Sequence, residues 1–261
     1  MRPDPFVHVA RCLADVKWMT PDQGRIVYDH LRRTDARDVL DIGTCFGASA
    51  GYLAAAVLAN GGGRVTTVDS SQFDSVTPAK ETVESNLAAC GVRELVDIVR
   101  IPHSSYAWWL KEQVEARTDE AGNCSPAYDF VYLDGAKSLT IDGVSVVLIE
   151  RLLRPGGWLL LDDLDWTFDY NPTAAQTDGV TYAMSPAERS EPHVRAVFEL
   201  IVKGYPSFTQ LRLMDGQWGW AQKQPDAPRR YSVEYSRPLG DVVMDRGRRL
   251  VRSLRARRAG G

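Results

Sequence analysis

Several features that define special protein classes are missing from the 261 residues of this chain. No apolar run approaches the roughly 20 residues that a membrane-spanning helix needs. The N-terminal segment carries scattered charges and lacks the apolar core of a secretory signal. The four cysteines lie far apart and include no Cys-x-x-Cys pair, which argues against a zinc site or a disulfide framework. We therefore expect a cytoplasmic globular protein with free thiols and no membrane association.

Lysine is missing from residues 224–261, which carry ten arginines and four acids. This extension has a net charge of +6, whereas the residues before it have a net charge of −9. Such an asymmetry suggests a separate role for the extension. Its apolar residues fall near helical spacing and predict a basic amphipathic helix; they are Leu239, Val243, Leu250 and Leu254. The expected partner, in preference to a membrane or RNA, is the acidic body of the same chain or of a second subunit in a homodimer.

Short apolar segments of β type alternate with helical patterns from residue 38 onward. The predicted strands cover residues 38–43, 64–69, 95–101, 128–134 and 158–163, and the last follows a tight turn at 154–157. Strands without polar alternation, separated by helices, predict a parallel sheet covered on both faces. We therefore expect an α/β fold with a doubly wound, mostly parallel, Rossmann-like sheet. A C-terminal antiparallel hairpin over 208–223, turning at Asp-Gly, completes it.

A glycine-bearing turn joins the first predicted strand to the helix after it. Gly43 and Gly47 let the backbone approach a ligand closely. The spacing, D-x-G-x-x-x-G, differs from the G-x-G-x-x-G of dinucleotide enzymes and places Asp41 before the first glycine. Asp69 ends the next strand, where an acid accepts hydrogen bonds from both hydroxyls of a ribose. The two features in register predict a nucleoside site at the carboxyl edge of the sheet.

The glycine turn in "LDIGTCFGAS", the acid that ends the second strand and "RLLRPGGWLLLDD" resemble the class I S-adenosylmethionine-dependent methyltransferases. Further segments are similar to the metal-dependent O-methyltransferases of the catechol and caffeoyl-CoA type. "MTPDQGRIVYDHL" resembles the lead-in helix of that family, "YDFVYLDGAK" its D-x-x-K strand end, and "DGQWGWAQK" its closing strand. "LLLDDLDW" stands where the family has D-N-x-L-W. The resemblance covers residues 17–223.

This resemblance implies transfer of a methyl group from S-adenosylmethionine to a hydroxyl of a small-molecule acceptor, such as a catechol or vicinal diol of a natural product. The residues expected to contact the cofactor are Asp41, Gly43, Thr44, Gly47, Ser49, Asp69, Ser70, Ser104, Ser105 and Asp134. Met19 and Trp166 are expected to contact the acceptor.

The resemblance also implies a domain organisation. Residues 1–37 form an N-terminal helical cap, residues 38–223 the methyltransferase domain, and residues 224–261 the basic extension. Within the domain, residues 164–190 are polar, aromatic and interrupted by proline and glycine. A loop of this length typically serves as a lid over a substrate site.

Three acids end two of the predicted strands. Asp134 follows the fourth strand, and Asp162 and Asp163 end the fifth. Adjacent strand ends in a sheet lie about 5 Å apart, so the three carboxylates would converge at one edge. Their mutual repulsion raises their pKa values, and a divalent cation such as Mg²⁺ would offset it with hard oxygen ligands. The resembled family binds a metal at the same positions, so these acids are the expected metal ligands.

Lys137 lies three residues after Asp134, where the resembled family places its general base. A divalent cation and a sulfonium nearby would depress the pKa of a lysine. Lys137 and Asp134 are therefore the expected catalytic residues. The chain departs from the family pattern at Asp163, where the family has asparagine, and at "HSS" after the third strand. His103 in that segment is either a second base or a residue of the loop.

Three alternatives remain open at this point. The first is a metal-independent methyltransferase that acts on a sugar hydroxyl, an amine or a carboxylate. The second is a nicotinamide-dependent oxidoreductase, against which the spacing of the glycine turn and the Asp-Asp pair argue. The third is a nucleic-acid-binding protein that uses the basic extension, which the net charge of −9 on the body makes unfavourable.

Overall fold

The computed structural model describes residues 4–70, 79–102, 104–170, 184–214 and 217–225. All of these belong to one structural unit, Met1–Pro225, and the second unit, Asp226–Gly261, lies outside the described residues. The predicted basic helix therefore lies outside them, as do His103, residues 171–183 of the predicted lid and the Asp-Gly turn of the hairpin. In the described part of the chain, no helix is both long and apolar enough to cross a membrane.

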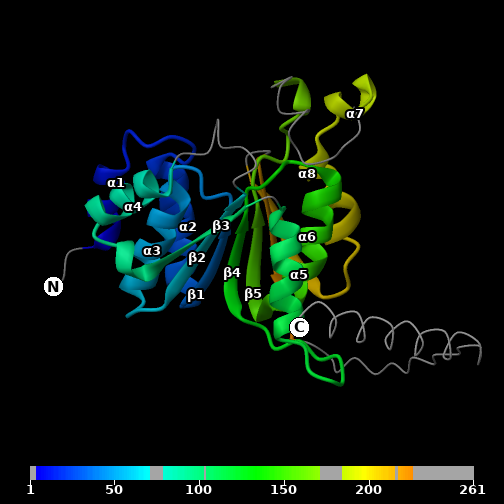
Figure 1. The fold of residues 1–261 in the computed structure, drawn as a ribbon, viewed down its shortest axis with the longest axis horizontal. Coiled ribbons are helices and arrows are strands. Elements are labelled where there is room, and N and C mark those ends of the chain that lie inside the picture. Colours follow the sequence, from blue (N-terminus) through cyan, green and yellow to red (C-terminus); the bar gives the residue numbers. More distant parts are fainter. Residues whose placement is uncertain (1–3, 71–78, 103, 171–183, 215–216, 226–261) are drawn as a thin grey trace, which may run out of the picture. The chain divides into compact units, whose positions relative to one another are not determined.

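The sheet has seven strands in the order β3-β2-β1-β4-β5-β7-β6 (Figure 1). Its strands are β1 Asp38–Ile42, β2 Arg64–Ser70, β3 Val96–Ile101, β4 Tyr128–Leu133, β5 Leu153–Leu161, β6 Phe208–Met214 and β7 Trp218–Lys223. The neighbouring strands among β1–β5 are parallel, and β7 pairs antiparallel with both β5 and β6. This topology confirms the predicted doubly wound sheet with a C-terminal antiparallel hairpin.

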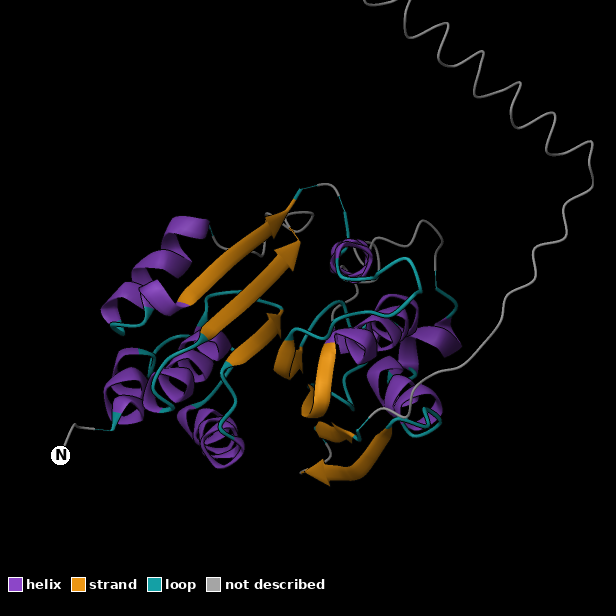
Figure 2. Ribbon diagram, turned by 90° about the horizontal axis from the view of Figure 1, so that it is seen from below, coloured by secondary structure: helices purple, strands orange, loops and turns teal. Residues whose placement is uncertain are grey.

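Two groups of helices cover the sheet (Figures 1 and 2). The first group is α1 Pro5–Cys12, α2 Pro21–Thr34, α3 Ala48–Ala59 and α4 Lys80–Ala89. The second is α5 Tyr106–Ala116, α6 Leu139–Leu152 and α8 His193–Ala196, which continues as a π-helical segment, Val197–Val202. Shorter helical segments are α7 Pro186–Ser190 and two 3₁₀ turns, Arg93–Leu95 and Phe168–Tyr170.

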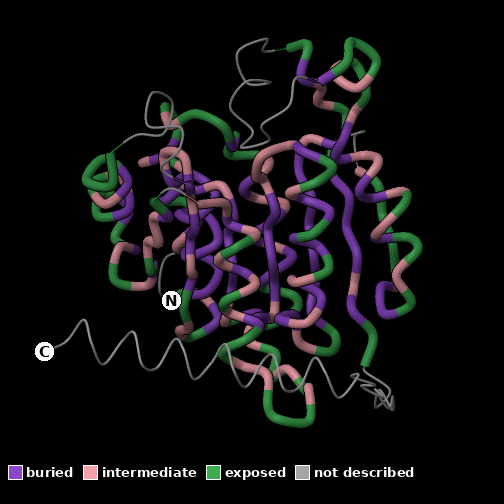
Figure 3. The backbone as a smooth tube through the Cα atoms, turned by 45° about the vertical axis from the view of Figure 1, so that its right-hand side comes forward, coloured by how far each residue is buried: buried purple, intermediate pink, exposed green. Residues whose placement is uncertain are grey.

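Successive residues of the central strands contribute to two separate hydrophobic clusters, because side chains alternate between the faces of a strand. Phe130 and Leu160 pack with α1–α4, whereas Val131 and Leu159 pack with α5, α6 and α8. The central strands are buried along their length while the outer faces of the helices are exposed (Figure 3). The near-continuous apolar composition of these strands therefore reflects burial on both faces.

The structure corrects the predicted turn at residues 154–157. These residues belong to β5, which begins at Leu153, and the pairing with β4 shifts register at this point. Arg154 donates to the carboxylates of Asp129 at 2.7 Å and Asp38 at 2.8 Å, at the starts of β4 and β1. This link keeps the segment in the sheet, and the extra residues form a bulge instead of a turn.

Candidate active site

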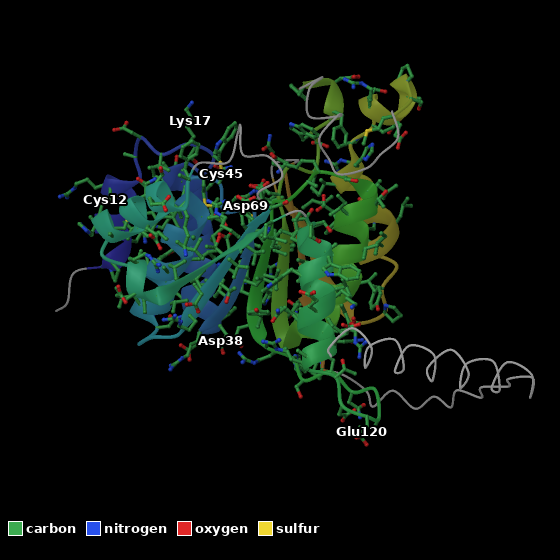
Figure 4. All side chains as sticks on the ribbon, viewed as in Figure 1. Cys12, Lys17, Asp38, Cys45, Asp69 and Glu120 are labelled. Carbon is green, nitrogen blue, oxygen red and sulfur yellow. The ribbon has the colours of Figure 1, made fainter. Side chains whose placement is uncertain are left out.

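The carboxyl edge of the parallel strands brings the predicted nucleoside-binding residues together. Cys45 and Asp69 lie at this edge, and Asp38, the first residue of β1, lies at the opposite end of the sheet (Figure 4). Gly43 has a φ of 101°, and a Cβ atom there would overlap the carbonyl oxygen of Asp134. Only glycine therefore lets the turn after β1 pack against the end of β4.

Asp41 is completely buried at the end of β1. Its Oδ2 accepts hydrogen bonds from Ser49 Oγ at 3.1 Å and Thr67 Oγ1 at 2.7 Å, while its Oδ1 has no partner among the described residues. Burial raises the pKa of Asp41 to about 7, against the hydrogen bonds from the two hydroxyls. An orphaned, buried carboxylate oxygen is unfavourable unless a ligand donor meets it, so this atom fits the ammonium group of a bound amino acid. Thr44, also in the predicted set, bonds to Thr67 Oγ1 at 2.7 Å.

Asp69 ends β2 beside the glycine turn. Its Oδ2 accepts from the backbone amide of Cys45 at 2.9 Å and pairs with Arg100 Nη1 at 3.4 Å. Burial raises the pKa of Asp69, and both donors oppose that shift. Arg100 did not enter the predicted set, although it stands opposite Asp69 in the β2–β3 register. The only sign of it in the sequence was a cation within the apolar third strand.

The predicted serines have mainly internal partners. Ser70 donates to the carbonyl of Ser104 at 2.8 Å, which links the ends of β2 and β3. Ser105 is the N-cap of α5 and accepts from the amide of Trp108 at 3.3 Å. The structure therefore brings Ser70 and Ser104 together at the edge, while the Ser105 hydroxyl stabilises the helix terminus.

Lys137 lies between two of the predicted metal ligands. Its ammonium forms an ion pair with the Asp134 carboxylate and another with Asp163 Oδ2, at 2.7 Å. Lys137 and Asp163 both have left-handed backbone conformations, with φ of 60° and 56°. Residues other than glycine occupy this region at a cost and are concentrated at functional sites.

A buried network holds the loop that carries Lys137. The amide of Ala136 donates to the Tyr106 hydroxyl at 2.8 Å, and that hydroxyl donates to the Asp142 carboxylate. The other oxygen of Asp142 accepts from the amide of Ser138 at 2.9 Å. Tyr106 and Asp142 thus fix the backbone on both sides of Lys137, a role that the sequence did not indicate.

Asp162 is buried and accepts hydrogen bonds from three donors. It is 6% exposed and accepts from the Tyr132 hydroxyl, from Trp218 Nε1 at 2.7 Å and from the Asp163 amide at 2.7 Å. Burial raises its pKa, and the charge of Lys137 opposes the shift. Oδ1 accepts two of these bonds, which uses both of its lone pairs.

The three predicted metal ligands therefore do not share one open position. Asp134 and Asp163 share the ammonium of Lys137, and Asp162 is engaged by donors from β4 and β7. Among the residues that the structure describes, no group of three His, Cys, Asp or Glu side chains is arranged to hold a metal ion. The residues as arranged do not fit a three-carboxylate divalent site.

The predicted acceptor contacts lie in different surroundings. Met19 is buried in the cluster formed with α1–α4, whereas its neighbour Trp18 is 67% exposed. Trp166 is half-buried against the ring of Phe168, with the centroids 4.9 Å apart, in a small cluster with Met184. This cluster borders residues 171–183 of the predicted lid.

Comparisons with known proteins agree with this fold. Residues 40–164 match a family described as "Methyltransferase domain". A search of curated proteins found no match.

Among solved structures, the chain is similar to an O-methyltransferase from Bacillus cereus in complex with SAH (18% identity, 86% of this chain, 92% of that chain, TM-score 0.57). It is also similar to the O-methyltransferase TomG from Streptomyces achromogenes, involved in tomaymycin synthesis, in complex with SAM (20% identity, 86% of this chain, 91% of that chain, TM-score 0.55). A third similar structure is a putative caffeoyl-CoA O-methyltransferase from Staphylococcus aureus (19% identity, 83% of this chain, 91% of that chain, TM-score 0.54). At these identities the likeness establishes the fold.

The matched segment contains the end of β1, all of β2–β5, the glycine turn and the acids at the strand ends. Together with the sheet order, the match shows that residues 40–164 have the fold of a methyltransferase domain.

Proposed function

We propose that the protein transfers the methyl group of S-adenosylmethionine to a hydroxyl of a small molecule. The observation that carries this proposal is the placement of two sites at adjacent strand ends. The buried carboxylate of Asp41 and the half-buried carboxylate of Asp69 lie at the ends of β1 and β2, and the Lys137 cluster follows β4, the other neighbour of β1. The three similar structures described above are named O-methyltransferases, which supports oxygen as the acceptor atom.

The cofactor site in this proposal uses the two acids differently. The orphaned Oδ1 of Asp41 receives the α-ammonium of the cofactor. Asp69 accepts from the ribose hydroxyls, and its bond from the Cys45 amide orients the carboxylate for that contact. Gly43 and Gly47 keep the turn between them close to the ligand. The remaining predicted contacts, Thr44, Ser49, Ser70, Ser104, Ser105 and Asp134, stay predictions.

The Lys137 cluster receives the acceptor hydroxyl. The oxygen attacks the sulfonium methyl in line, and the main contribution of the protein is to hold both reactants in that geometry. The predicted assignments of Lys137 as the base, of a Mg²⁺ site and of a catechol or vicinal diol as acceptor stay predictions. The contacts of Asp162 and Lys137 favour the metal-independent alternative, of whose acceptors the sugar hydroxyl fits this proposal.

Calorimetric titration with S-adenosylhomocysteine tests the cofactor site. Asp69→Asn keeps an acceptor for the Cys45 amide but cannot accept from both ribose hydroxyls. We expect its affinity to fall by about 1–3 kcal/mol, the cost of a buried polar group left without a partner.

The control is Asp97→Asn, an acid near the start of β3 that pairs with Arg64. Its affinity should equal that of the wild type. Unchanged affinity in Asp69→Asn would remove the proposed ribose contact, and no binding by the wild-type protein would overturn the proposed function.

A further inference from the structure

The ammonium of Lys137 is held between two carboxylates at the edge of the sheet where the acceptor is proposed to bind. Lys137 reaches Asp134 within its own loop and Asp163 across the neighbouring strand end. The left-handed conformations of Lys137 and Asp163 bring the two side chains together, and the Tyr106–Asp142 network holds one of the two loops in place. The backbone conformations of the two loops therefore determine the position of the Lys137 ammonium between the carboxylates.

The arrangement gives the edge a cation without a metal ligand set. Asp163 supplies a second carboxylate for the ammonium, and the Asp162 carboxylate accepts hydrogen bonds from Trp218 and Tyr132. A divalent ion bound by Asp134 and Asp163 would have to displace the ammonium of Lys137. The ion and the ammonium would then lie side by side and repel each other, because both are positively charged. One covalently attached ammonium thus occupies the position that both carboxylates can reach.

We propose that the Lys137 ammonium is the resident cation of this site and that methyl transfer proceeds without a divalent metal. This inference rests on the proposed function. Lys137 donates a hydrogen bond to the acceptor oxygen, and its positive charge stabilises the negative charge that develops there. Its two carboxylate contacts orient the ammonium before the acceptor arrives, so no reorganisation is needed during the reaction.

The Asp163 side chain, 34% exposed, is the member of the cluster most accessible to an acceptor. Asp163 is the base in this proposal, in place of the predicted Lys137: the hydroxyl proton passes to the Asp163 carboxylate as the oxygen lone pair forms a bond to the methyl carbon. The carbon–sulfur bond breaks, and its electron pair stays on sulfur, which turns the sulfonium into the neutral thioether. The proton on Asp163 then leaves to solvent, so charge and atoms balance without another reactant.

Titration with Mn²⁺, followed by the loss of the electron paramagnetic resonance signal of the free ion, tests the resident cation directly. The wild-type protein should bind Mn²⁺ only in the millimolar range. Lys137→Met leaves Asp134 and Asp163 without their shared cation, so we expect Mn²⁺ affinity to rise by about tenfold or more, because two hard oxygen ligands become available. Lys137→Arg keeps a cation and should behave as the wild type.

The double variant Lys137→Met/Asp163→Asn should lose the gained affinity, which locates the ion at this pair. Micromolar Mn²⁺ binding by the wild-type protein would overturn the proposal on its own, whether or not the variants fold. So would a folded Lys137→Met variant, checked by its melting temperature, in which affinity is unchanged or weaker.

Calorimetry with S-adenosylhomocysteine separates this inference from the proposed function. Its affinity should be similar in the wild type and in Lys137→Met, because the cofactor contacts of Asp41 and Asp69 are intact. A wild-type protein that does not bind the cofactor product would contradict the proposed function, while the Mn²⁺ titration would still report on the cation.

Discussion

His30 is a buried titratable group far from the proposed chemistry. Its ring lies on α2 against Phe130, Trp158 and Trp220, with centroid distances of 5.8, 4.9 and 4.6 Å. Burial lowers the pKa of His30 to about 4, and the positive charges of Arg33 and Arg212 act in the same direction. Asp41 shows the opposite effect, since burial raises its pKa to about 7. Two residues of similar burial thus respond to pH with opposite sign.

We expect His30 to destabilise the fold as the pH falls from about 6.5 to about 4, because the unfolded chain then binds a proton that the folded chain does not. The stabilisation of the fold by the neutral ring of His30 is complete above pH 6.5. About 3 kcal/mol of it is lost as the pH falls to about 4. Urea unfolding of the wild type and of His30→Phe at several pH values measures it.

Asp41 acts against His30 in the same pH range, because protonation of its buried carboxyl favours the folded state. The informative quantity is therefore the difference between the wild type and His30→Phe, in which the contribution of Asp41 cancels. A difference that does not change between pH 7 and pH 4 would contradict the shifted pKa of His30.

Close packing between α2 and α3 depends on glycine at the element scale. A Cβ atom at Gly24 would lie 2.6 Å from the ring of Tyr52 on α3. That ring is fully buried and stacks on Phe6 of α1, with centroids 5.6 Å apart, so it has little room to move. Gly51 of α3 also faces a close neighbour, but the nearest atom is the flexible end of Leu13.

Gly24→Ala should lower the free energy of unfolding by about 1–3 kcal/mol, because overpacking against the Tyr52 ring outweighs the better helix propensity of alanine. Gly51→Ala is the matched control, since Leu13 can change its rotamer, and we expect a smaller loss there. Denaturant melts of the two variants check the order. Equal losses would mean that backbone propensity, and not the aromatic contact, decides the effect.

The charge of the whole molecule is divided between an acidic body and the basic extension of residues 224–261. The extension lies almost entirely outside the described residues, so its predicted helix, its partner and a homodimer stay predictions. The end of the described chain offers a clean boundary, because the amide of Gln224 donates to the carbonyl of Ser207 at 2.8 Å and completes the pairing of β7. A protein that ends at Pro225 keeps that bond.

Truncation after Pro225 should lower the melting temperature by about 2–4 °C, the shift that corresponds to roughly 1 kcal/mol in a domain of this size, or should dissociate a dimer. The reason is the loss of attraction between charges of opposite sign, so 1 M salt should narrow the difference. Calorimetry and light scattering measure both effects. A truncated protein with the same melting temperature and mass would show that the extension is solvated.

The order of elements and the ends of the central strands followed from the sequence alone. The helix expected after the glycine turn is α3, Ala48–Ala59, and Asp41, Asp69 and Asp134 lie at the predicted edge. The reason is local, because apolar strands separated by helical patterns are typical of a parallel sheet that helices cover on both faces. The fold class and the nucleoside-binding turn were therefore readable from residue spacing.

The partners of the acids depended on the tertiary structure. Asp162 and Asp163 are neighbours in sequence, yet Asp162 bonds to Trp218 of β7 and Asp163 pairs with Lys137. Asp162 and Asp163 follow the end of β5, and the neighbouring strands β4 and β7 supply the donors for Asp162 through Tyr132 and Trp218. The positions of the acids in the sequence indicated a cluster of three carboxylates. The tertiary structure decided that Asp134 and Asp163 share Lys137, and that Asp162 accepts hydrogen bonds from side chains of β4 and β7.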